Sequence, residues 1–259
     1  MWNPNEYLKF SNHRDRPFFD LMTQVLTDSP RVVADLGCGT GHLTATLAQR
    51  FTSARVWGVD SSAEMLCAAQ KHAQPGRLDF LRADLSSWTP PEQVELIVSN
   101  AALQWVPDHA ALIPRLSGLL TDGGWLAIQM PANFDAPSHT LLRELTSSSR
   151  WWGLLEGADE PRHSRPIAWY IATLERLGFR VNAWETIYQQ ILHGENPVLE
   201  WVKGTALRPV LARLKGQDEN EFLLEYGSRL LEAYPPRDFG TLLPFKRQFI
   251  VAQKGAEHA

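Results

Sequence analysis

The chain has 259 residues, a length that suits one large domain or one domain with an elaborated cap. Hydrophobic residues make up 44% and charged residues 21%, a balance typical of globular rather than disordered proteins. With 25 basic against 29 acidic residues the net charge is −4, which argues against a nucleic-acid-binding protein.

Cysteine usage and hydropathy set the expected compartment. Cys38 and Cys67 are too few for a disulfide framework, and no signal-like segment follows Met1. No apolar run approaches the ~18 residues that a membrane span needs. We therefore expect a cytoplasmic protein without a membrane partner; the sequence gives no indication of its oligomeric state.

Strands and helices alternate along the first half of the chain. Pro17 suits the first turn of a helix, and Asp122-Gly123-Gly124 is expected to form a turn before a strand. The patterns predict helices over 17–26, 41–50, 61–72 and 108–120, and strands over 31–36, 55–60, 78–82, 95–100 and 125–130. This alternation indicates repeated β-α-β units, hence an α/β fold with a doubly wound, mostly parallel Rossmann-like sheet.

The second half is more helical. We predict a helix over 167–177, a strand over 179–189, a helical block over 197–236 broken near Pro209 and Gly216, and a final strand over 247–253. The helical block has too little apolar surface to be an independent domain. The chain is thus interpreted as one domain over 1–259, with an N-terminal helical cover (1–28), a cofactor-binding core (31–130), a variable insertion (131–165) and a helical cap (197–236).

The densest chemical signal is the segment Asp35-Leu36-Gly37-Cys38-Gly39-Thr40-Gly41, between a predicted strand and a predicted helix. Glycines allow a sharp turn and a close approach of a ligand. A dinucleotide turn has the spacing G-x-G-x-x-G, whereas here it is G-x-G-x-G with an aspartate before it. A carboxylate would repel a pyrophosphate but suits a ligand with an ammonium and a sulfonium. This favours S-adenosylmethionine over NAD, and so disfavours a hydride-transferring oxidoreductase.

Further polar residues follow the next strands. Asp60 ends the second strand and is positioned to accept both ribose hydroxyls, while Asp84 after the third is positioned to accept from an adenine amino group. We expect Leu85 to pack on the adenine ring. We also expect the methyl group to meet its acceptor beside the segment from Asn100 to Trp105. The predicted cofactor-binding residues are Asp35, Gly37, Cys38, Gly39, Gly41, Asp60, Ser61, Asp84, Leu85, Asn100 and Ala101.

These motifs resemble those of the class I S-adenosylmethionine-dependent methyltransferases. Later segments resemble, more specifically, the branch that esterifies one carboxylate of trans-aconitate. Those segments are Asn100-Ala101 with Gln104-Trp105-Val106-Pro107-Asp108-His109, Gln129-Met130-Pro131 with Asn133, Leu207-Arg208-Pro209, and Phe245 with Arg247 and Phe249. The chain departs from the pattern at Thr40, at Ala132 and over Ser147–Arg165.

The resemblance implies a last strand antiparallel to the others, S-adenosylmethionine as methyl donor, S-adenosylhomocysteine as product, and a monomethyl ester of a small polycarboxylate. A methyltransferase of the same fold that acts on another carboxylic acid is the alternative. A third reading, from a different class, is a module that binds S-adenosylmethionine without catalysis.

An ionised carboxylate needs no general base, so no acid or base residue is assigned. We interpret His13, His109 and His139 as hydrogen-bonding or structural residues, and no histidine or cysteine pair has a zinc-binding spacing. Alignment of the reacting atoms and exclusion of water are expected to carry catalysis.

A tricarboxylate still needs cations, which arginine's planar fork supplies. We expect Arg14 or Arg16 to approach from the N-terminal side, Arg208 from the helical cap and Arg247 from the start of the last strand. The predicted acid-binding residues are Tyr7, Arg14, Arg16, Gln104, Trp105, Arg208 and Arg247.

Overall fold

The computed structural model describes residues 11–158 and 163–255, with the backbone alone for 11–14. Within them the chain divides into two compact units. Unit 1 holds residues 11–130, 163–185 and 248–255, and unit 2 holds residues 131–158 and 186–247. No helix in these ranges is long and apolar enough to cross a membrane.

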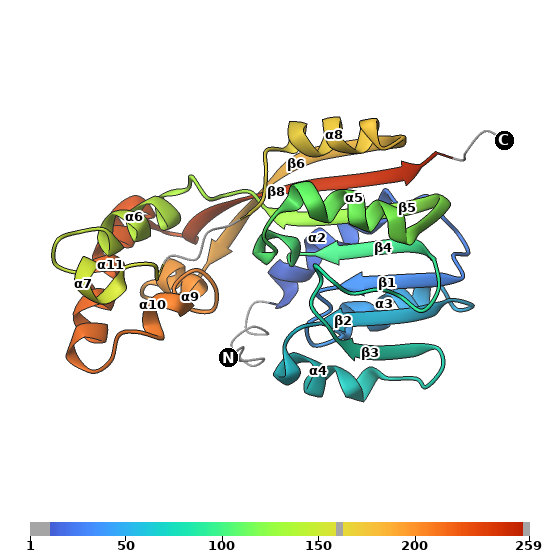
Figure 1. The fold of residues 1–259 in the computed structure, drawn as a ribbon. Helices are drawn as coiled ribbons and strands as arrows, with labels where there is room; N and C mark the ends of the chain where they lie inside the picture. The colour runs from blue at the N-terminus through green and yellow to red at the C-terminus, as the bar shows by residue number, and fades with distance from the viewer. Residues whose placement is uncertain (1–10, 159–162, 256–259) are drawn as a thin grey trace. The chain divides into compact units, whose positions relative to one another are not determined.

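A mostly parallel sheet with the strand order β3-β2-β1-β4-β5-β8-β6 forms the centre of unit 1, and β7 pairs with β8 (Figure 1). Its strands are β1 (Val32–Leu36), β2 (Arg55–Asp60), β3 (Leu78–Arg82), β4 (Val94–Asn100), β5 (Leu120–Pro131), β6 (Phe179–Leu192), β7 (Pro236–Arg237) and β8 (Gly240–Lys254). Strands β1 to β5 pair in parallel, and β8 runs against them in Figure 1, as expected. The chain passes from unit 1 to unit 2 within β6 and returns within β8.

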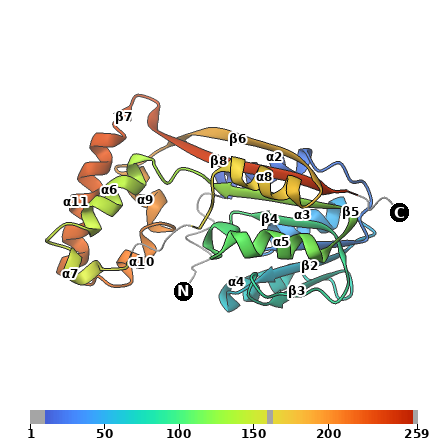
Figure 2. The ribbon, with the colours of Figure 1, turned by 45° about the horizontal axis from the view of Figure 1, so that its top comes forward.

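The helices of unit 1 cover both faces of its part of the sheet. They are α2 (Ser11–Thr23), α3 (His42–Arg50), α4 (Ala63–Ala69), η1 (Gln70–His72), η2 (Leu103–Trp105), α5 (His109–Leu119) and α8 (Ile167–Arg176). Helices α5 and α8 lie on one face (Figure 2), while α3 contacts β2 and α4 contacts β2 and β3. The doubly wound arrangement predicted from the sequence is therefore confirmed.

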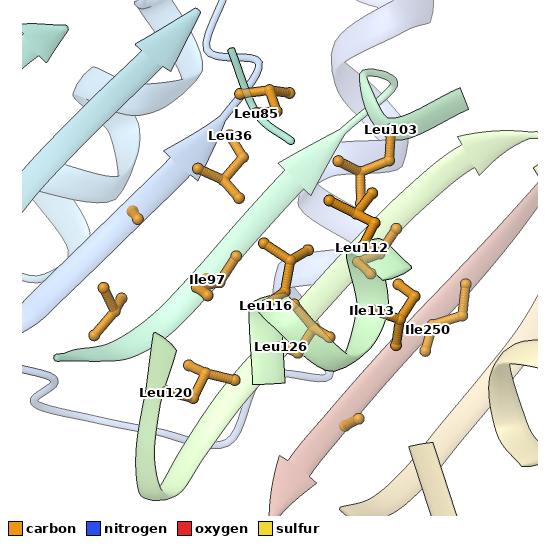
Figure 3. Packing of buried hydrophobic residues seen from close by; sticks show 14 of the residues in the cluster. Leu36, Leu85, Ile97, Leu103, Leu112, Ile113, Leu116, Leu120, Leu126 and Ile250 are labelled. Atoms are coloured by element: carbon orange, nitrogen blue, oxygen red, sulfur yellow. The ribbon is translucent and has the colours of Figure 1, made fainter. Parts of the chain in front are cut away.

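The main apolar cluster packs helix α5 against the sheet (Figure 3). Leu112, Ile113 and Leu116 of α5 recur at helical spacing and are at most 3% exposed. They meet Ile97 of β4 and Leu126 of β5, both fully buried. A parallel strand buried on both faces has to be apolar throughout, so a polar side chain inside these strands needs a specific reason.

Unit 2 is mainly helical. Its helices are α6 (Pro137–Thr146), α7 (Trp152–Leu155), α9 (Pro197–Lys203), α10 (Arg208–Leu211) and α11 (Gln217–Ala233). Two tyrosines hold both backbone groups of Ser138 near the start of α6: Tyr226 donates to its carbonyl at 2.5 Å, and its N–H donates to Tyr234 at 3.1 Å. Burial raises the pKa of Tyr226, so this hydroxyl stays protonated as a donor.

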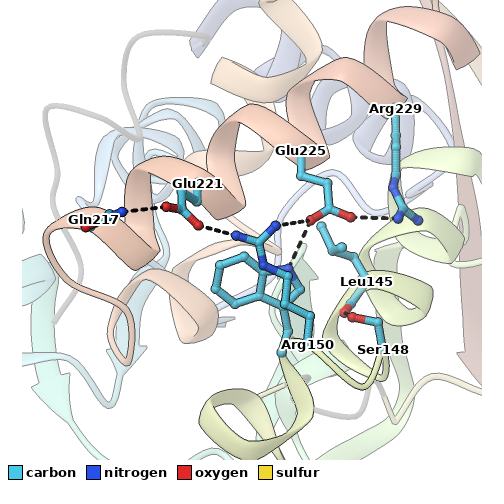
Figure 4. A network of polar contacts seen from close by, with 8 residues as sticks. Leu145, Ser148, Arg150, Gln217, Glu221, Glu225 and Arg229 are labelled. Carbon is cyan, nitrogen blue, oxygen red and sulfur yellow. Dashed lines mark hydrogen bonds and ion pairs between the residues drawn. The ribbon is translucent and has the colours of Figure 1, made fainter.

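A group of charged side chains, the Glu225 network, joins α11 to the segment after α6 (Figure 4). Glu225 accepts from Arg229 at 2.8 Å and from the indole N–H of Trp151 at 3.1 Å. Arg150 pairs with Glu221 and lies 3.6 Å from Glu225. The hydrogen bond from Trp151, followed by the arginines, lowers the pKa of Glu225.

Several predicted boundaries are wrong; the strand predicted over 179–189, for example, continues to Leu192. Three of these errors have an identifiable physical cause. Pro17 lies inside α2, which ends at Thr23, because burial of Phe18, Leu21 and Met22 compensates for the hydrogen bond that a proline interrupts. Strand β5 begins at Leu120, because the glycine-rich segment forms an irregularity in its pairing with β4 rather than a turn before it.

The third wrong boundary is that of β8. This strand begins at Gly240 and pairs with β7 there, so Arg247 lies in its middle and not at its start. The predicted strand was too short because only the part in unit 1 has the continuous apolar run that the sequence displays.

Candidate active site

The predicted cofactor-binding residues gather where β1, β2 and β4 end. The pairing of β1 with both neighbours brings these three strand ends together, since Asp35 is in register with Gly58 on one side and Val98 on the other. The hydroxyl of Ser99, at the end of β4, donates to the carbonyl of Leu36 at 2.7 Å and fixes β4 against the start of the glycine turn. We call this place the carboxyl edge of the sheet.

The glycine turn has its three glycines in the left-handed region, with φ of 82° at Gly37, 55° at Gly39 and 75° at Gly41. A Cβ on Gly37 would lie 2.1 Å from that of Ala102, and one on Gly41 would lie 2.7 Å from the ring of Phe80. A Cβ on Gly39 would meet nothing within 4 Å in the described structure. Gly37 and Gly41 are therefore required by packing, and only Gly39 faces the open space that a ligand can use.

Asp60 links the glycine turn to the next helix. One carboxylate oxygen accepts from the N–H of Gly39 and the other from the N–H of Ser62, each at 2.9 Å. Ser62 is the N-cap of α4 and accepts from the N–H of Met65, so Ser61 is left exposed beside it. Because each carboxylate oxygen has a second lone pair, Asp60 keeps acceptor capacity for two hydroxyl groups.

Asp35 points into the protein. Its carboxylate is 3% exposed and accepts from the hydroxyl of Thr44 on α3 at 2.6 Å. Burial raises its pKa to about 6, the Thr44 hydrogen bond opposes that rise, and the charge of Asp60 adds to it. The buried thiol of Cys38 also has a strongly raised pKa, mainly from burial, so it is not a thiolate nucleophile. The edge thus concentrates negative charge that a cation would stabilise.

The residues after β3 are arranged around a turn. Asp84 is exposed and accepts from the N–H and the hydroxyl of Ser86 at 2.8 and 2.7 Å; the hydroxyl bond is the main cause of its lowered pKa. Leu85 is buried in the main apolar cluster, and its Cδ1 would lie 3.8 Å from a Cβ on Gly37. Asp84 is therefore ionised and exposed beside a buried leucine.

The turn after β4 contains buried polar atoms. Ala101 has a φ of 55°, which a non-glycine residue rarely adopts, and its N–H donates to the carbonyl of Gln129 at 2.9 Å. Gln104 is 4% exposed and donates through Nε2 to the carbonyl of Ala101 at 2.8 Å. Oδ1 of Asn100 and Oε1 of Gln104 are buried acceptors for which residues 11–158 and 163–255 provide no donor.

The sequence interpretation missed residues that support the glycine turn. His42 is the first residue of α3. Its Nε2 donates to a carboxylate oxygen of Asp15 of α2 at 2.9 Å, and its Nδ1 lies 3.1 Å from the hydroxyl of Thr40. Thr44 holds Asp35. The one available signal was that His42 follows the last glycine directly; its partner, 27 residues earlier, carries no motif.

His109 is a core residue, as the sequence interpretation proposed. Its Nε2 must carry the proton, because it lies 2.8 Å from the carbonyl of Leu103, which only accepts. Nδ1 then accepts from the hydroxyl of Tyr170 at 2.5 Å, and that oxygen accepts from the N–H of Arg165. Burial lowers the pKa of His109 and raises that of Tyr170 to about 12, so both stay neutral.

The predicted acid-binding residues belong to both units. Tyr7 and the side chain of Arg14 lie outside the described residues. Arg16 is exposed on α2, 3.7 Å from Asp20, and Trp105 is half-buried in η2. Two residues belong to unit 2: Arg208 is half-buried at the start of α10, and Arg247 is 4% exposed with its guanidinium 4.6 Å from the ring centre of Phe245.

The residues at the carboxyl edge fit S-adenosylmethionine. Three features suit a ligand that is rich in donors and positively charged: the open space at Gly39, the acceptor capacity of Asp60, and the buried oxygens of Asn100 and Gln104, which meet no donor in the described part of the chain. A pyrophosphate brings acceptors and negative charge only, so it would leave those buried oxygens without donors.

Comparison with known proteins agrees with this chemistry. Residues 33–124 match the family model described as a methyltransferase domain. The chain is 48% identical to the trans-aconitate 2-methyltransferase of Streptomyces avermitilis, over 98% of this chain and 97% of that one. It is also 48% identical to the enzyme of the same name from Rhodococcus jostii, over 98% of this chain and 99% of that one.

Solved structures with the same fold are more distant in sequence. The YcgJ protein of Bacillus subtilis aligns with a TM-score of 0.60 at 14% identity, over 92% of this chain and 97% of that one. The phosphoethanolamine N-methyltransferase 2 of Haemonchus contortus, solved with S-adenosylhomocysteine, aligns with a TM-score of 0.55 at 17% identity, over 93% of this chain and 52% of that one. These likenesses concern the fold alone.

Proposed function

The chain belongs to the trans-aconitate 2-methyltransferase family, and from that premise we propose that it methylates one carboxylate of trans-aconitate, giving a monomethyl ester and S-adenosylhomocysteine. The observation that carries the proposal is the similarity over nearly the whole length to enzymes of that name. The buried oxygens of Asn100 and Gln104, which meet no donor among the described residues, independently support S-adenosylmethionine as the methyl donor.

S-adenosylmethionine supplies a methyl group on a positively charged sulfur. A carboxylate oxygen attacks that carbon, the carbon–sulfur bond breaks, and its electron pair stays on sulfur, so no proton moves. The neutral, buried His109 is consistent with a reaction that needs no base. The chain's own contribution is to hold the two reactants in line and to exclude water.

For the cofactor, we assign the ribose to Asp60, the adenine to Asp84 and Leu85, and the rest of the molecule to the space above Gly39 and the end of β4. The support is that the strand order places β3, β2, β1 and β4 side by side, so these residues form one row along the edge. Asp60 also fixes the N–H of Gly39, so a single carboxylate would join the ribose to the glycine turn.

For the acid, we assign Arg208 and Arg247 as the cations that hold the carboxylates that do not react. The support is the resemblance of Leu207-Arg208-Pro209, and of Phe245 with Arg247 and Phe249, to segments of this family. Arg247 is also 4% exposed, with its guanidinium over the ring of Phe245, so it is held in a fixed position. Arginine also binds a carboxylate through two parallel hydrogen bonds, which fixes the orientation of the acid.

The proposal is tested by incubating the protein with S-adenosylmethionine and a panel of acids that includes trans-aconitate, cis-aconitate, citrate and a monocarboxylate. We expect mass analysis to show a monomethyl ester of trans-aconitate with the highest kcat/KM of the panel. A faster reaction with another acid would assign the protein to the alternative substrate class. Binding of S-adenosylhomocysteine with no methylated product from any acid would instead indicate a binding module.

The acid site is tested by Arg247→Ala and Arg208→Ala, with Arg150→Ala of the Glu225 network as a control in the same unit. Removing one partner of a buried charge pair costs several kcal/mol, so kcat/KM for trans-aconitate should fall about a hundredfold or more. The loss should be much smaller for the monocarboxylate, and cofactor affinity should stay unchanged. Equal losses for both acids would mean that these arginines support the fold.

A further inference from the structure

The side chain of Gln104 has a fixed orientation. It lies at the carboxyl edge, 4% exposed, and its amide faces the carbonyl of Ala101 at 2.8 Å. A carbonyl only accepts hydrogen bonds, so the NH₂ side of the amide must be the side that faces it. The oxygen Oε1 therefore points the other way, and among the described residues no donor reaches it.

The bond from Gln104 stabilises an unfavourable backbone. Ala101 has a φ of 55°, a left-handed conformation that is unfavourable for an alanine. Its two backbone groups are both held, the N–H by Gln129 of β5 and the carbonyl by Gln104. The next residue, Ala102, packs against Gly37 of the glycine turn. The amide NH₂ of Gln104 is thus already used to set the shape of the edge.

Of the two reactants, only the cofactor offers a donor for Oε1. Ionised trans-aconitate has acceptors only, so it cannot satisfy a buried carbonyl oxygen, and one of the two N–H groups of the amide is already used by Ala101. S-adenosylmethionine carries an ammonium, ribose hydroxyls and an adenine amino group. The second unsatisfied acceptor, Asn100, belongs to the same turn, so a ligand with several donors on one atom suits the pair.

The position of Gln104 indicates which donor group of the cofactor can reach its Oε1. In the strand order β3-β2-β1-β4, Asp84 and Asp60 follow β3 and β2, so the adenosine is assigned to that side of β1. Gln104 follows β4, on the other side of β1. The part of the cofactor that remains for that side is its amino acid, whose ammonium has three N–H groups. The buried carboxylate of Asp35, in β1 between the two sides, adds negative charge beneath it.

We propose that Gln104 does not bind the acid but holds the α-ammonium of the cofactor through Oε1, together with Asn100, while its NH₂ holds Ala101. This assignment rests on the proposed function for the identity of the cofactor, and it revises the prediction that Gln104 is an acid-binding residue. Gln104 acts toward the reaction as a positioning residue, because the amino-acid end of the cofactor fixes where the methyl group lies.

The test compares two ligands by calorimetry: S-adenosylhomocysteine and its deaminated analogue, which lacks only the ammonium. In the wild type, we expect the first to bind about tenfold or more tightly than the second, the usual effect of a charge-assisted hydrogen bond. Gln104→Met removes the acceptor and should bring the two affinities to within about twofold. Gln104→Glu gives up the NH₂ that holds Ala101 but keeps an acceptor, now with a charge, and should retain or increase the preference for the ammonium.

The matched control is Gln253→Met. Gln253 also donates to a backbone carbonyl, that of Gly123 at 3.3 Å, but it lies near the start of β5 rather than at the carboxyl edge. This variant should keep the wild-type preference. The KM for trans-aconitate, measured at saturating cofactor, should change less than about twofold in Gln104→Met.

Three outcomes would overturn the inference. One is a wild-type ratio of affinities that persists in Gln104→Met; another is a rise in the KM for the acid with cofactor affinity unchanged. If Gln104→Met does not fold, the third outcome decides: equal affinity of Gln104→Glu for S-adenosylhomocysteine and its deaminated analogue would by itself overturn the inference. Failure of the proposed function is separate, because it would appear as wild-type protein that binds S-adenosylhomocysteine but esterifies no acid.

Discussion

The carboxyl edge of the sheet and the Glu225 network differ in whether their charged and polar groups have partners within the described structure. At the edge, Asp35 is buried with a raised pKa, and Asn100 and Gln104 hold buried oxygens without donors in the described structure. In the network, Glu225 meets three donors at a half-exposed position and its pKa is lowered. The network contributes to stability in the free protein, whereas the edge costs stability until a ligand compensates for it.

The largest expected effect comes from two glycines of the carboxyl edge, one required by packing and the other facing open space. Gly37→Ala would force a Cβ to 2.1 Å from Ala102 at a φ of 82°, and we expect it to lower the free energy of unfolding by about 3–5 kcal/mol. Gly39→Ala has open space and a φ of 55°, so it should cost only about 1–2 kcal/mol.

Urea unfolding and calorimetry with S-adenosylhomocysteine distinguish the two variants. Gly39→Ala, although more stable than Gly37→Ala, should lose most of its affinity because the added methyl group occupies the ligand's space. Equal losses of stability, or full affinity in Gly39→Ala, would show that the open space at Gly39 is not where the cofactor binds.

The next effect concerns Asp60. Asp60→Ala removes a charged acceptor, worth roughly 1.5–3 kcal/mol to a ligand hydroxyl, so the Kd for S-adenosylhomocysteine should rise tenfold or more. Asp79→Ala, on the neighbouring strand and 3.7 Å from Arg55, is the matched control and should leave the Kd unchanged. An unaltered Kd in Asp60→Ala would refute the ribose assignment.

The smallest effect is expected in the network. Glu225→Gln keeps the shape of the side chain but removes its charge, and pairs at this exposure contribute about 0.2–1 kcal/mol. Thermal unfolding should show a loss in that range, reduced further in high salt, with no change in cofactor affinity. A loss above ~2 kcal/mol would mean that the network supports unit 2 as strongly as a buried pair would.

The sequence predicts those parts of the fold that local chemistry determines. The bounds of β2 and β3 are as predicted, because β-branched and aromatic residues are followed directly by charged residues and turns. The glycine turn was predicted because three closely spaced glycines after a buried strand have few other uses. The helix start at Ser62 follows from its side chain, which accepts a hydrogen bond from the N–H of Met65 and so caps the helix.

What the sequence did not predict depends on partners distant along the chain. Asp35 turns towards Thr44, and His42 meets Asp15, only because α3 and α2 pack as they do. The orientation of Gln104 depends on the positive φ of Ala101, which the sequence does not indicate because the residue is not a glycine. The extension of β8 depends on its pairing with a two-residue strand. Each follows from tertiary packing, which overrides local preference.

The contrast between stability and binding is tested most directly by Asp35→Asn. Burial raises the pKa of Asp35 from 3.8 to about 6, so the folded state holds a proton that the unfolded state loses between these pH values. The contribution of this carboxyl to stability is therefore present below about pH 4 and is lost as the pH rises through about 6. Asparagine keeps an acceptor for Thr44 without the charge.

The measurement is the free energy of unfolding of Asp35→Asn and wild type at pH 8, paired with the Kd for S-adenosylhomocysteine at the same pH. We expect the variant to be more stable by ~1–3 kcal/mol, given about 1.4 kcal/mol per pKa unit, and to bind the ligand more weakly. The gain in stability should vanish near pH 4. A variant that loses stability and affinity together at pH 8 would contradict the account. Asp35 would then stabilise the fold, and its charge would not be a cost that a bound cation offsets.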